Sequence, residues 1–200
     1  PLLLKTRHDT KSSIISYMKL YLVTGNSKKV EIAKFALVKH NINVEQLEME
    51  TPEIQSSDTE EVAKYSVKYA ADKTGKTVIK GDFGMVIEIL NGFPGPFVKF
   101  INKWFNAKQF SSLYKEKLNP QAYFIDSLGY CEPGKEPVCF STKTFGKLID
   151  KPRGDNGNMV DSFFIPKGYK KTIAELSKEE TLKLWANDRY NQLARYLKDK

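Results

Sequence analysis

Residues 78–99 read V-I-K-G-D-F-G-M-V-I-E-I-L-N-G-F-P-G-P-F-V-K, and no other stretch says as much about the fold. A β-branched pair leads into Gly81-Asp82, a second apolar run follows, and the turn N-G-F-P-G-P closes the segment. Glycine permits positive φ and proline fixes φ, so this turn has a defined shape. An acid at the end of a buried strand needs a partner, and in phosphate chemistry that partner is usually a metal ion. We therefore predict that Asp82 ends a strand and binds a metal.

A second informative segment lies near the start, where residues 18–29 read M-K-L-Y-L-V-T-G-N-S-K-K. A short apolar strand is followed by the turn Thr24-Gly25-Asn26 and then by a run with helical spacing. Backbone N–H groups and the helix dipole favour an anion at such a helix start. The spacing of a Walker loop is absent, however, and most turns of this kind merely connect two elements. The segment alone therefore leaves phosphate binding open.

The order of apolar patterns predicts one α/β domain over residues 18–200. We expect strands at 20–23, 44–49, 78–79, 85–90, 121–131 and 137–147, and helices at 28–40, 59–73, 99–105 and 109–114. Ser177 begins a last helix, or a kinked pair of helices, that continues to Leu197. Residues 1–17 are mostly polar and are predicted to be a leader or a flexible extension. A signal peptide is not expected, because the apolar runs in this segment are too short.

The amino-acid composition limits the classes of protein to which this chain can belong. The 200 residues are 40% hydrophobic, enough for a core, and no run approaches the roughly 20 apolar residues that span a bilayer. A net charge of +8 suits nucleic acid or a triphosphate. Since the basic residues are spread out and no nucleic-acid-binding motif is present, neither nucleic acid nor a membrane is an expected partner. Cys131 and Cys139 form no C-x-x-C pair, so they are expected to be small buried residues of a cytoplasmic protein.

Taken together with later motifs, the two segments resemble the inosine/xanthosine triphosphate pyrophosphatase family. The resemblance rests on T-G-N-x-x-K at 24–29, P-E-I-Q at 52–55, D-x-G at 82–84, L-N-G-F-P-G-P-F-V-K-F at 90–100, P-R-G at 152–154, and F-I-P-K-G-Y with K-T-I-A-E-L within 164–176. Order and spacing match from Met18 to the end of the chain. The resemblance implies an elongated mixed β-sheet with flanking helices, in two lobes around a central cleft, and a homodimer.

The family hydrolyses nucleoside triphosphates between the α- and β-phosphates to a monophosphate and pyrophosphate, and the resemblance implies this substrate class with Mg²⁺ as cofactor. Such chemistry requires cations on the phosphates, a divalent metal and an activated water. By motif position, Asp82 and Lys29 are predicted to be catalytic, and Glu53 and Asp82 to bind the metal. The predicted substrate contacts are Thr24, Gly25, Asn26, Lys29, Lys68, Lys99, Asp161, Lys183, Asp188 and Arg189.

Three motifs depart from the family pattern. The family's E-D-[ST]-G is G-D-F-G at 81–84, which removes one carboxylate and one hydroxyl. Its F-G-[YW]-D is N-M-V-D at 158–161, which lacks the aromatic platform for the base. Its S-H-R is N-D-R at 187–189, so an acid replaces the histidine that helps to read a 6-keto purine. Altered base specificity is expected, because a carboxylate suits an exocyclic amino group better than a keto oxygen.

Three interpretations follow from the sequence. The first is a metal-dependent nucleoside triphosphate pyrophosphatase with altered base specificity. The second is a catalytically impaired homologue that binds a nucleotide or a partner without turnover, and the third is a basic protein associated with nucleic acid. Lys29, Glu53, Lys68 and Asp82 favour the first, whereas Gly81 removes an acid from the catalytic cluster and keeps the second open. No sequence motif supports the third interpretation.

Overall fold

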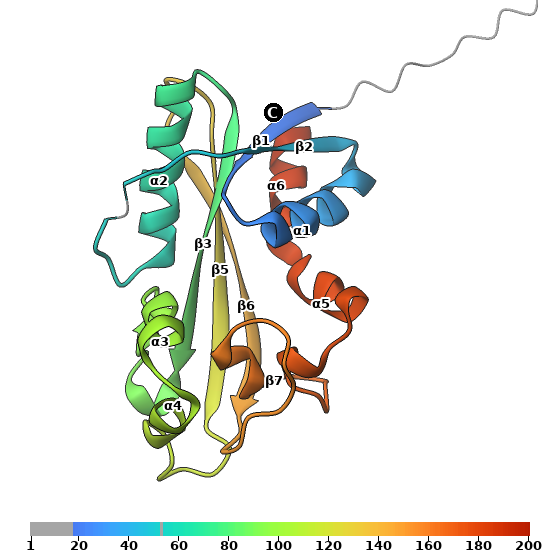
Figure 1. Ribbon diagram of the computed structural model, residues 1–200. Helices are drawn as coiled ribbons and strands as arrows, with labels where there is room; N and C mark the ends of the chain where they lie inside the picture. The colour runs from blue at the N-terminus through green and yellow to red at the C-terminus, as the bar shows by residue number, and fades with distance from the viewer. Residues whose placement is uncertain (1–17, 53) are drawn as a thin grey trace, which may run out of the picture.

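The computed structural model describes residues 18–52 and 54–200, which form an elongated α/β fold around one twisted sheet (Figure 1). The strands follow the spatial order β2 (Ile42–Leu47), β1 (Met18–Val23), β3 (Val78–Ile87), β5 (Gln121–Cys131), β6 (Val138–Leu148) and β7 (Phe164–Pro166), and the short β4 (Pro94–Gly95) pairs with β3. β1 runs parallel to β2 and to β3, and the other pairings are antiparallel. The mixed sheet predicted from the sequence is confirmed.

The helices lie on both sides of the sheet (Figure 1). They are α1 (Ser27–Leu37), α2 (Thr59–Thr74), α3 (Val98–Trp104), α4 (Ala107–Ser112), α5 (Lys178–Trp185) and α6 (Asp188–Lys198). Short 3₁₀ turns occur at Val38–His40, Glu88–Leu90, Met159–Ser162 and Ile173–Glu175. The C-terminal segment is thus two helices, as one of the two sequence alternatives proposed. Within the described part of the chain, none of the helices is long and apolar enough to cross a membrane.

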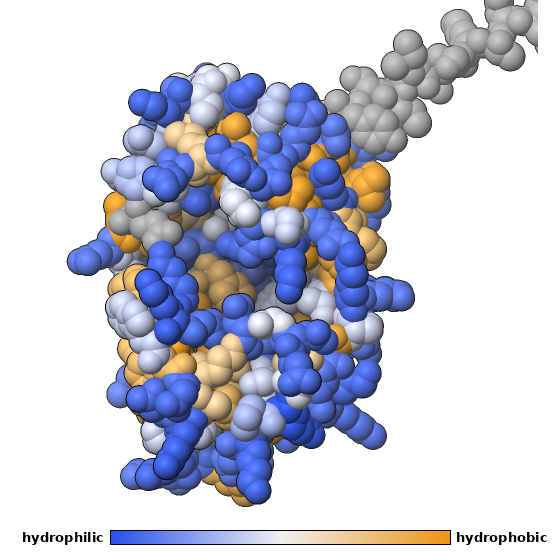
Figure 2. All heavy atoms as spheres, in the orientation of Figure 1, coloured by the Kyte–Doolittle hydropathy of each residue, from blue (hydrophilic) through white to orange (hydrophobic). Residues whose placement is uncertain are grey.

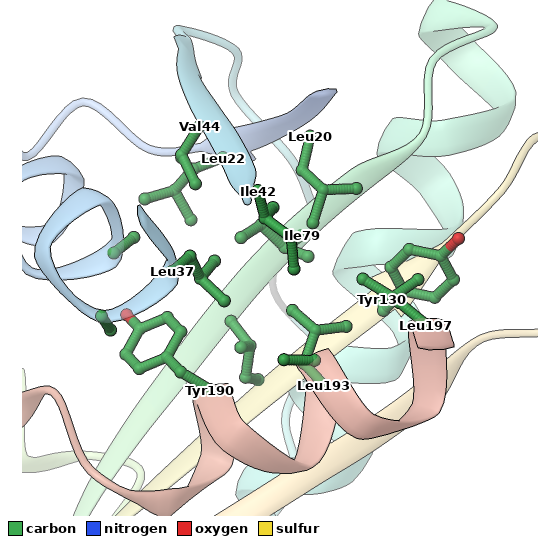
Figure 3. Close-up of a cluster of buried hydrophobic side chains, with 14 of the residues drawn as sticks. Leu20, Leu22, Leu37, Ile42, Val44, Ile79, Tyr130, Tyr190, Leu193 and Leu197 are labelled. Atoms are coloured by element: carbon green, nitrogen blue, oxygen red, sulfur yellow. The ribbon is translucent and has the colours of Figure 1, made fainter. Parts of the chain in front are cut away.

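The structure has three apolar cores, of which a small one packs α2 against the sheet and the two larger ones lie toward opposite ends of the long strands. One joins α1, α6 and strands β1, β2, β3 and β5 around Leu20, Leu37, Ile79 and Leu193, and Figure 3 shows these side chains pointing toward one another. The other gathers around Phe110, Phe124 and Phe163 at the end of the molecule that holds α3 and α4. Because β3 and β5 run through both larger cores, their middle residues lie at the junction between the two lobes.

One sequence prediction about the central strand is wrong. We expected two strands, at 78–79 and 85–90, with Asp82 at the end of the first, whereas β3 is one continuous strand from Val78 to Ile87. The reason is its partner: every residue from Val78 to Ile87 pairs in unbroken register with β5, including Asp82 with Ser127. Gly81 and Gly84 do not interrupt the ladder, and the predicted strand 88–90 is a 3₁₀ turn.

Other boundaries shift by a few residues. The helix predicted at 28–40 ends at Leu37 and continues as a 3₁₀ turn, because Asn41 adopts a left-handed backbone with φ of 58°. The strand predicted at 44–49 spans Ile42–Leu47, where it follows β1 residue by residue. Both cysteines are free thiols, and Cys131 is buried while Cys139 is half-buried, close to the prediction for them.

The middle of β3 has an open edge. β1 pairs with β3 only at Val78 and Ile79, and β4 pairs with it at Met85 and Val86. Between these pairings, residues 80–84 have β5 on one side and no described strand on the other. Figure 2 shows the molecule hollowed at mid-height on the viewed face. An unpaired strand edge in such a recess presents backbone and side-chain groups to a ligand.

Candidate functional site

The turn after β1 lies beside this open edge. β1 and β3 are parallel, and their last pair is Leu22 opposite Ile79, so the turn that begins at Thr24 follows just beyond the end of this pairing. The turn is ordered by its own side chains: Thr24 Oγ1 accepts from Asn26 N at 3.1 Å, and Asn26 Oδ1 caps α1 by accepting from Lys28 N at 2.9 Å. Asn26 Oδ1 also accepts from Lys29 N at 3.4 Å. Two of the amides that the sequence offered to an anion are therefore engaged by the cap, which leaves the lysine side chains and the helix dipole.

The two lysines at the start of α1 act on two buried carboxyl groups from distant segments. Asp161, in the Met159–Ser162 turn, has a pKa raised to about 6 by burial, and the Lys28 ammonium opposes this shift. Burial also raises the pKa of Asp126 on β5, and Arg189, Asn187 and Lys29 lower it. Opposite charges act in this way only when they lie close together. Lys28 therefore lies near Asp161, and Lys29 lies near Asp126.

Asp126, Asn187 and Arg189 form a buried polar cluster between the two larger cores. Arg189 Nη1 lies 3.4 Å from Asp126 Oδ2, and Asn187 Nδ2 donates to the same oxygen at 3.2 Å. Arg189 Nη1 also donates to Asn187 Oδ1, and the guanidinium lies 4.5 Å from the centre of the Tyr190 ring. Since α6 begins at Asp188, this cluster is held by the first turn of a helix packed on the sheet.

Asp82 lies on the opposite face of β3 from Phe83, because successive strand residues alternate between faces. Its direct partner Ser127 forms a hydroxyl pair with Thr59 at 2.7 Å and another with Ser141 at 3.0 Å. Gly84 lets the start of α2 and the turn of β4 approach this face, since a Cβ there would lie 3.0 Å from Thr59 Cγ2. Asp82 thus stands in a narrow polar part of the open edge.

The donor set at this edge fits Mg²⁺, which binds through one or two carboxylates and retains several waters. Asp82 supplies a carboxylate on the open edge, where substrate phosphates and waters could complete the shell. Glu53, the other predicted ligand, lies outside the described residues. Within 18–52 and 54–200 no cluster of three or more His, Cys, Asp or Glu side chains could hold a metal by itself.

Several predicted contacts are engaged elsewhere in this structure. The Lys68 ammonium pairs with Asp72, whose other oxygen accepts from Gly134 N at 3.0 Å, in the turn between β5 and β6. Lys183 Nζ lies 2.6 Å from Glu179 on its own helix. Lys68 and Lys183 are thus paired with acids of their own helices, α2 and α5, whereas Arg189 is held beside Asp126.

Two further predicted residues lie at the margins of the site. Asp188 is exposed, and its carboxylate faces its own helix, where it accepts from Gln192 Nε2 at 3.1 Å and lies 3.6 Å from Arg195. Lys99, in the first turn of α3, is exposed and lies 5.1 Å from the centre of the Phe100 ring. Neither contact directs the side chain toward the Asp126 cluster.

Aromatic side chains absent from the 158–161 motif occur next to the polar cluster. Phe83, directly opposite Asp126 in the sheet, stacks on Phe124 with ring centroids 4.8 Å apart. Trp185, at the end of α5, meets Phe83 edge-on at 5.5 Å. Phe83 and Trp185 are both half-buried, whereas Val160 of the motif is buried in the core. Aromatic surface is therefore present beside Arg189, although it comes from other positions.

Sequence reasoning missed Asp126, Lys28 and the Phe83–Trp185 pair as candidate site residues. Asp126 carried a signal, since an acid interrupts the apolar run Y-F-I-D-S-L-G-Y of a strand that we predicted correctly. A charge inside such a strand needs a partner. That partner, Arg189, lies 63 positions away in the chain, and only the fold brings the two together.

Comparisons with known proteins agree with this architecture. Residues 20–190 match the model of the Ham1 family. A dITP/XTP pyrophosphatase of Methanopyrus kandleri is 40% identical over 167 residues, which cover 84% of this chain and 89% of that protein. A dITP/XTP pyrophosphatase of Thermococcus kodakarensis is 32% identical over 183 residues, or 91% of this chain and 98% of that protein.

Solved structures show the same fold. A HAM1 protein from Coxiella burnetii superimposes with a TM-score of 0.75 at 22% identity and covers 92% of this chain and 100% of its own. The Ham1 protein of Staphylococcus aureus gives a TM-score of 0.68 at 24% identity, with 90% and 98% covered. Since the family model spans most of the chain and relatives exceed 30% identity over nearly their full length, this protein belongs to the Ham1 family.

Proposed function

We propose that this protein is a nucleoside triphosphate pyrophosphatase, which hydrolyses a nucleoside triphosphate to a monophosphate and pyrophosphate. One structural relationship supports the proposal: β1 and β3 run parallel as far as Leu22 opposite Ile79, and the T-G-N turn and Gly81-Asp82 both follow within a few residues of this last pair. A cationic helix start and a carboxylate at one edge are what a metal–triphosphate complex requires. The dITP/XTP pyrophosphatase activity of close relatives supports the same reaction.

Each group has a defined task in this proposal. Lys29, exposed at the start of α1, neutralises charge that develops on the phosphates, and the helix dipole adds to this effect. Asp82 and Glu53 are the residues that would hold Mg²⁺, and the ion would supply Lewis-acid stabilisation of the phosphate oxygens. Thr24 and Asn26 fix the shape of the turn, so that the lysine is oriented before the substrate binds.

Base selection forms a separate part of the proposal. The protein is expected to prefer 6-keto purines less than its dITP/XTP-hydrolysing relatives do, because acidic Asp188 stands where the family has a histidine. The test compares inosine and adenosine triphosphates in wild type and in Asp188→His. A wild type that prefers inosine triphosphate by ~10²-fold or more would contradict this part, since that is the scale on which pocket polarity discriminates.

The reaction itself is tested by pyrophosphate release from a panel of nucleoside triphosphates with Mg²⁺. Wild type is expected to release pyrophosphate, and Asp82→Asn to be slower by ~10²-fold or more, as when a transition-state contact is removed. Asp199→Asn, at the exposed C-terminal end of α6, is the matched control and should retain full activity. Wild type that releases no pyrophosphate, yet binds nucleotides, would favour the catalytically impaired homologue instead.

The proposal also includes a homodimer, in line with the resemblance. Exposed aromatic residues on the α3 side support an interface there: Phe93 is 45% exposed, Phe97 40% and Trp104 65%. Solvent-exposed aromatics grouped in this way are typical of protein–protein contacts. Sedimentation of wild type and of Trp104→Glu would test it, and a wild type that sediments as a monomer would contradict it. The cytoplasmic location remains a prediction from the sequence.

A further inference from the structure

At the middle of β5 a charged residue lies between two apolar residues on the same face of the sheet. On the face covered by α6, β5 presents Phe124 to one core and Leu128 to the other, with Asp126 between them. Phe83 on β3 and Thr142 on β6 are its direct neighbours across the strands. Directly opposite residues share a face, so Phe83, Asp126 and Thr142 line one strip at the junction of the lobes.

A gain in folding stability does not explain why this strip contains a buried ion pair. Asp126 and Arg189 each keep 9% of the side chain exposed, and a buried ion pair of this kind contributes little net stability compared with apolar residues of the same size. Thr142 Oγ1 is buried and, among the described residues, has no hydrogen-bond partner. A buried hydroxyl without a partner is a rare and unfavourable feature of folded proteins. Two unfavourable polar features side by side point to a ligand-binding role.

The contacts of Asp126 leave one of its oxygens available. Arg189 and Asn187 both meet Oδ2, and the described residues donate no hydrogen bond to Oδ1. Phe83 and Trp185 add half-buried aromatic surface on the same side of the sheet. Lys29, the proposed phosphate lysine, lies close enough to lower the pKa of Asp126. The strip therefore combines an acceptor, aromatic surface and proximity to the phosphate end of the site.

We propose that Asp126 is a specificity-determining residue whose Oδ1 accepts a hydrogen bond from an exocyclic amino group of the substrate base. Carboxylates recognise amino groups on base edges in this way, and a carboxylate rejects a base that presents only acceptors. Arg189 and Asn187 hold the carboxylate in place. The proposal rests on the proposed function for the reaction, and it adds a buried residue on β5 to the base selection proposed for Asp188.

The test uses two triphosphates that differ only in the amino group, adenosine triphosphate and purine riboside triphosphate. For wild type, kcat/KM is expected to be at least ~10-fold higher for adenosine triphosphate, since a site built for an N–H donor discriminates against its absence. Asp126→Asn, which keeps the shape and removes the charge, should reduce that ratio by a factor of ~5 or more. Asp199→Asn should leave it unchanged, and the thermal unfolding of each variant is measured in parallel.

Two results would overturn the proposal. A wild-type ratio within about twofold of one would do so without any variant, so the test stands even if Asp126→Asn fails to fold. An unchanged ratio in folded Asp126→Asn, with both substrates slowed equally, would make Asp126 a purely structural residue. If wild type releases pyrophosphate from no triphosphate of the panel, the proposed function fails separately. Calorimetric Kd values for the same two nucleotides then give the ratio that supports or overturns the role of Asp126.

Discussion

Arg189 Nη1 lies 3.4 Å from Asp126 Oδ2, and this buried pair connects helix α6 to the central strand β5. Its position between the two larger apolar cores means that the charges cannot be solvated by a small movement of a surface loop. Burial raises the pKa of Asp126, and the guanidinium is the largest of the effects that lower it. Removing one of the two charges is therefore expected to lower the free energy of unfolding much more than removing both.

We expect Arg189→Met to lower the free energy of unfolding by about 3–5 kcal/mol, because it leaves the Asp126 carboxylate buried without its main counter-charge. The double variant Arg189→Met, Asp126→Leu should recover most of this loss, since apolar residues can replace a buried ion pair. Chemical denaturation of the two single variants and the double variant measures the coupling. Additive losses would show that the two side chains do not act as a pair.

The free energy of unfolding is expected to depend on pH through Asp161. Its pKa in the folded protein is raised from 3.8 to about 6, mainly by burial, so the folded state holds a proton that the unfolded state has released in this interval. Stability should therefore fall as pH rises from about 4 to about 6, by about 3 kcal/mol in total. Asp161→Asn cannot ionise and should lack this fall.

The measurement is the free energy of unfolding of wild type and Asp161→Asn across that interval. Asp155→Asn changes an exposed carboxylate of the same loop and should follow wild type. Parallel curves for wild type and Asp161→Asn would show that Asp161 does not titrate in this range.

The two predicted phosphate lysines are expected to behave differently. Lys29→Ala should weaken triphosphate binding by ~10-fold or more, since a charge-assisted contact is lost, and should make the affinity less dependent on salt. Lys68 is held by Asp72, so Lys68→Ala should have a smaller effect. Calorimetry with a triphosphate and with the corresponding nucleoside separates the phosphate contribution. Equal weakening by the two substitutions would show that Lys68 leaves Asp72 and reaches the substrate.

Much of the fold was predictable because it rests on local patterns. The alternating runs of β5 and β6 and the capped start of α2 at Asp58 gave nearly correct boundaries. Asp82 was placed at a strand end because it lies between two separate apolar runs, but an unbroken ladder with β5 joins these runs into one strand and outweighs the low strand propensity of glycine. The Asp126–Arg189 pair could not be predicted, because it depends on how α6 packs on the sheet. Pairings between distant segments are the part of a site that periodicity and spacing do not encode.

Gly81 offers a test of the missing family carboxylate. A Cβ at this position would meet only Ser127 O at 3.5 Å, an ordinary contact, and the backbone is not left-handed. Gly81→Glu should therefore fold. Its side chain starts on the face of β3 opposite Asp82, but at the unpaired edge this long side chain can turn toward the same metal, and it should then raise pyrophosphate release at limiting Mg²⁺ by ~10-fold. Gly81→Gln has the same size without the charge and should give no such gain. Gly129→Ala is a contrasting control for stability, since its Cβ would lie 2.8 Å from Ala63 O and should destabilise the fold by about 1–3 kcal/mol. Equal activities of the Glu and Gln variants would show that a second carboxylate on β3 is not what limits metal binding in this protein.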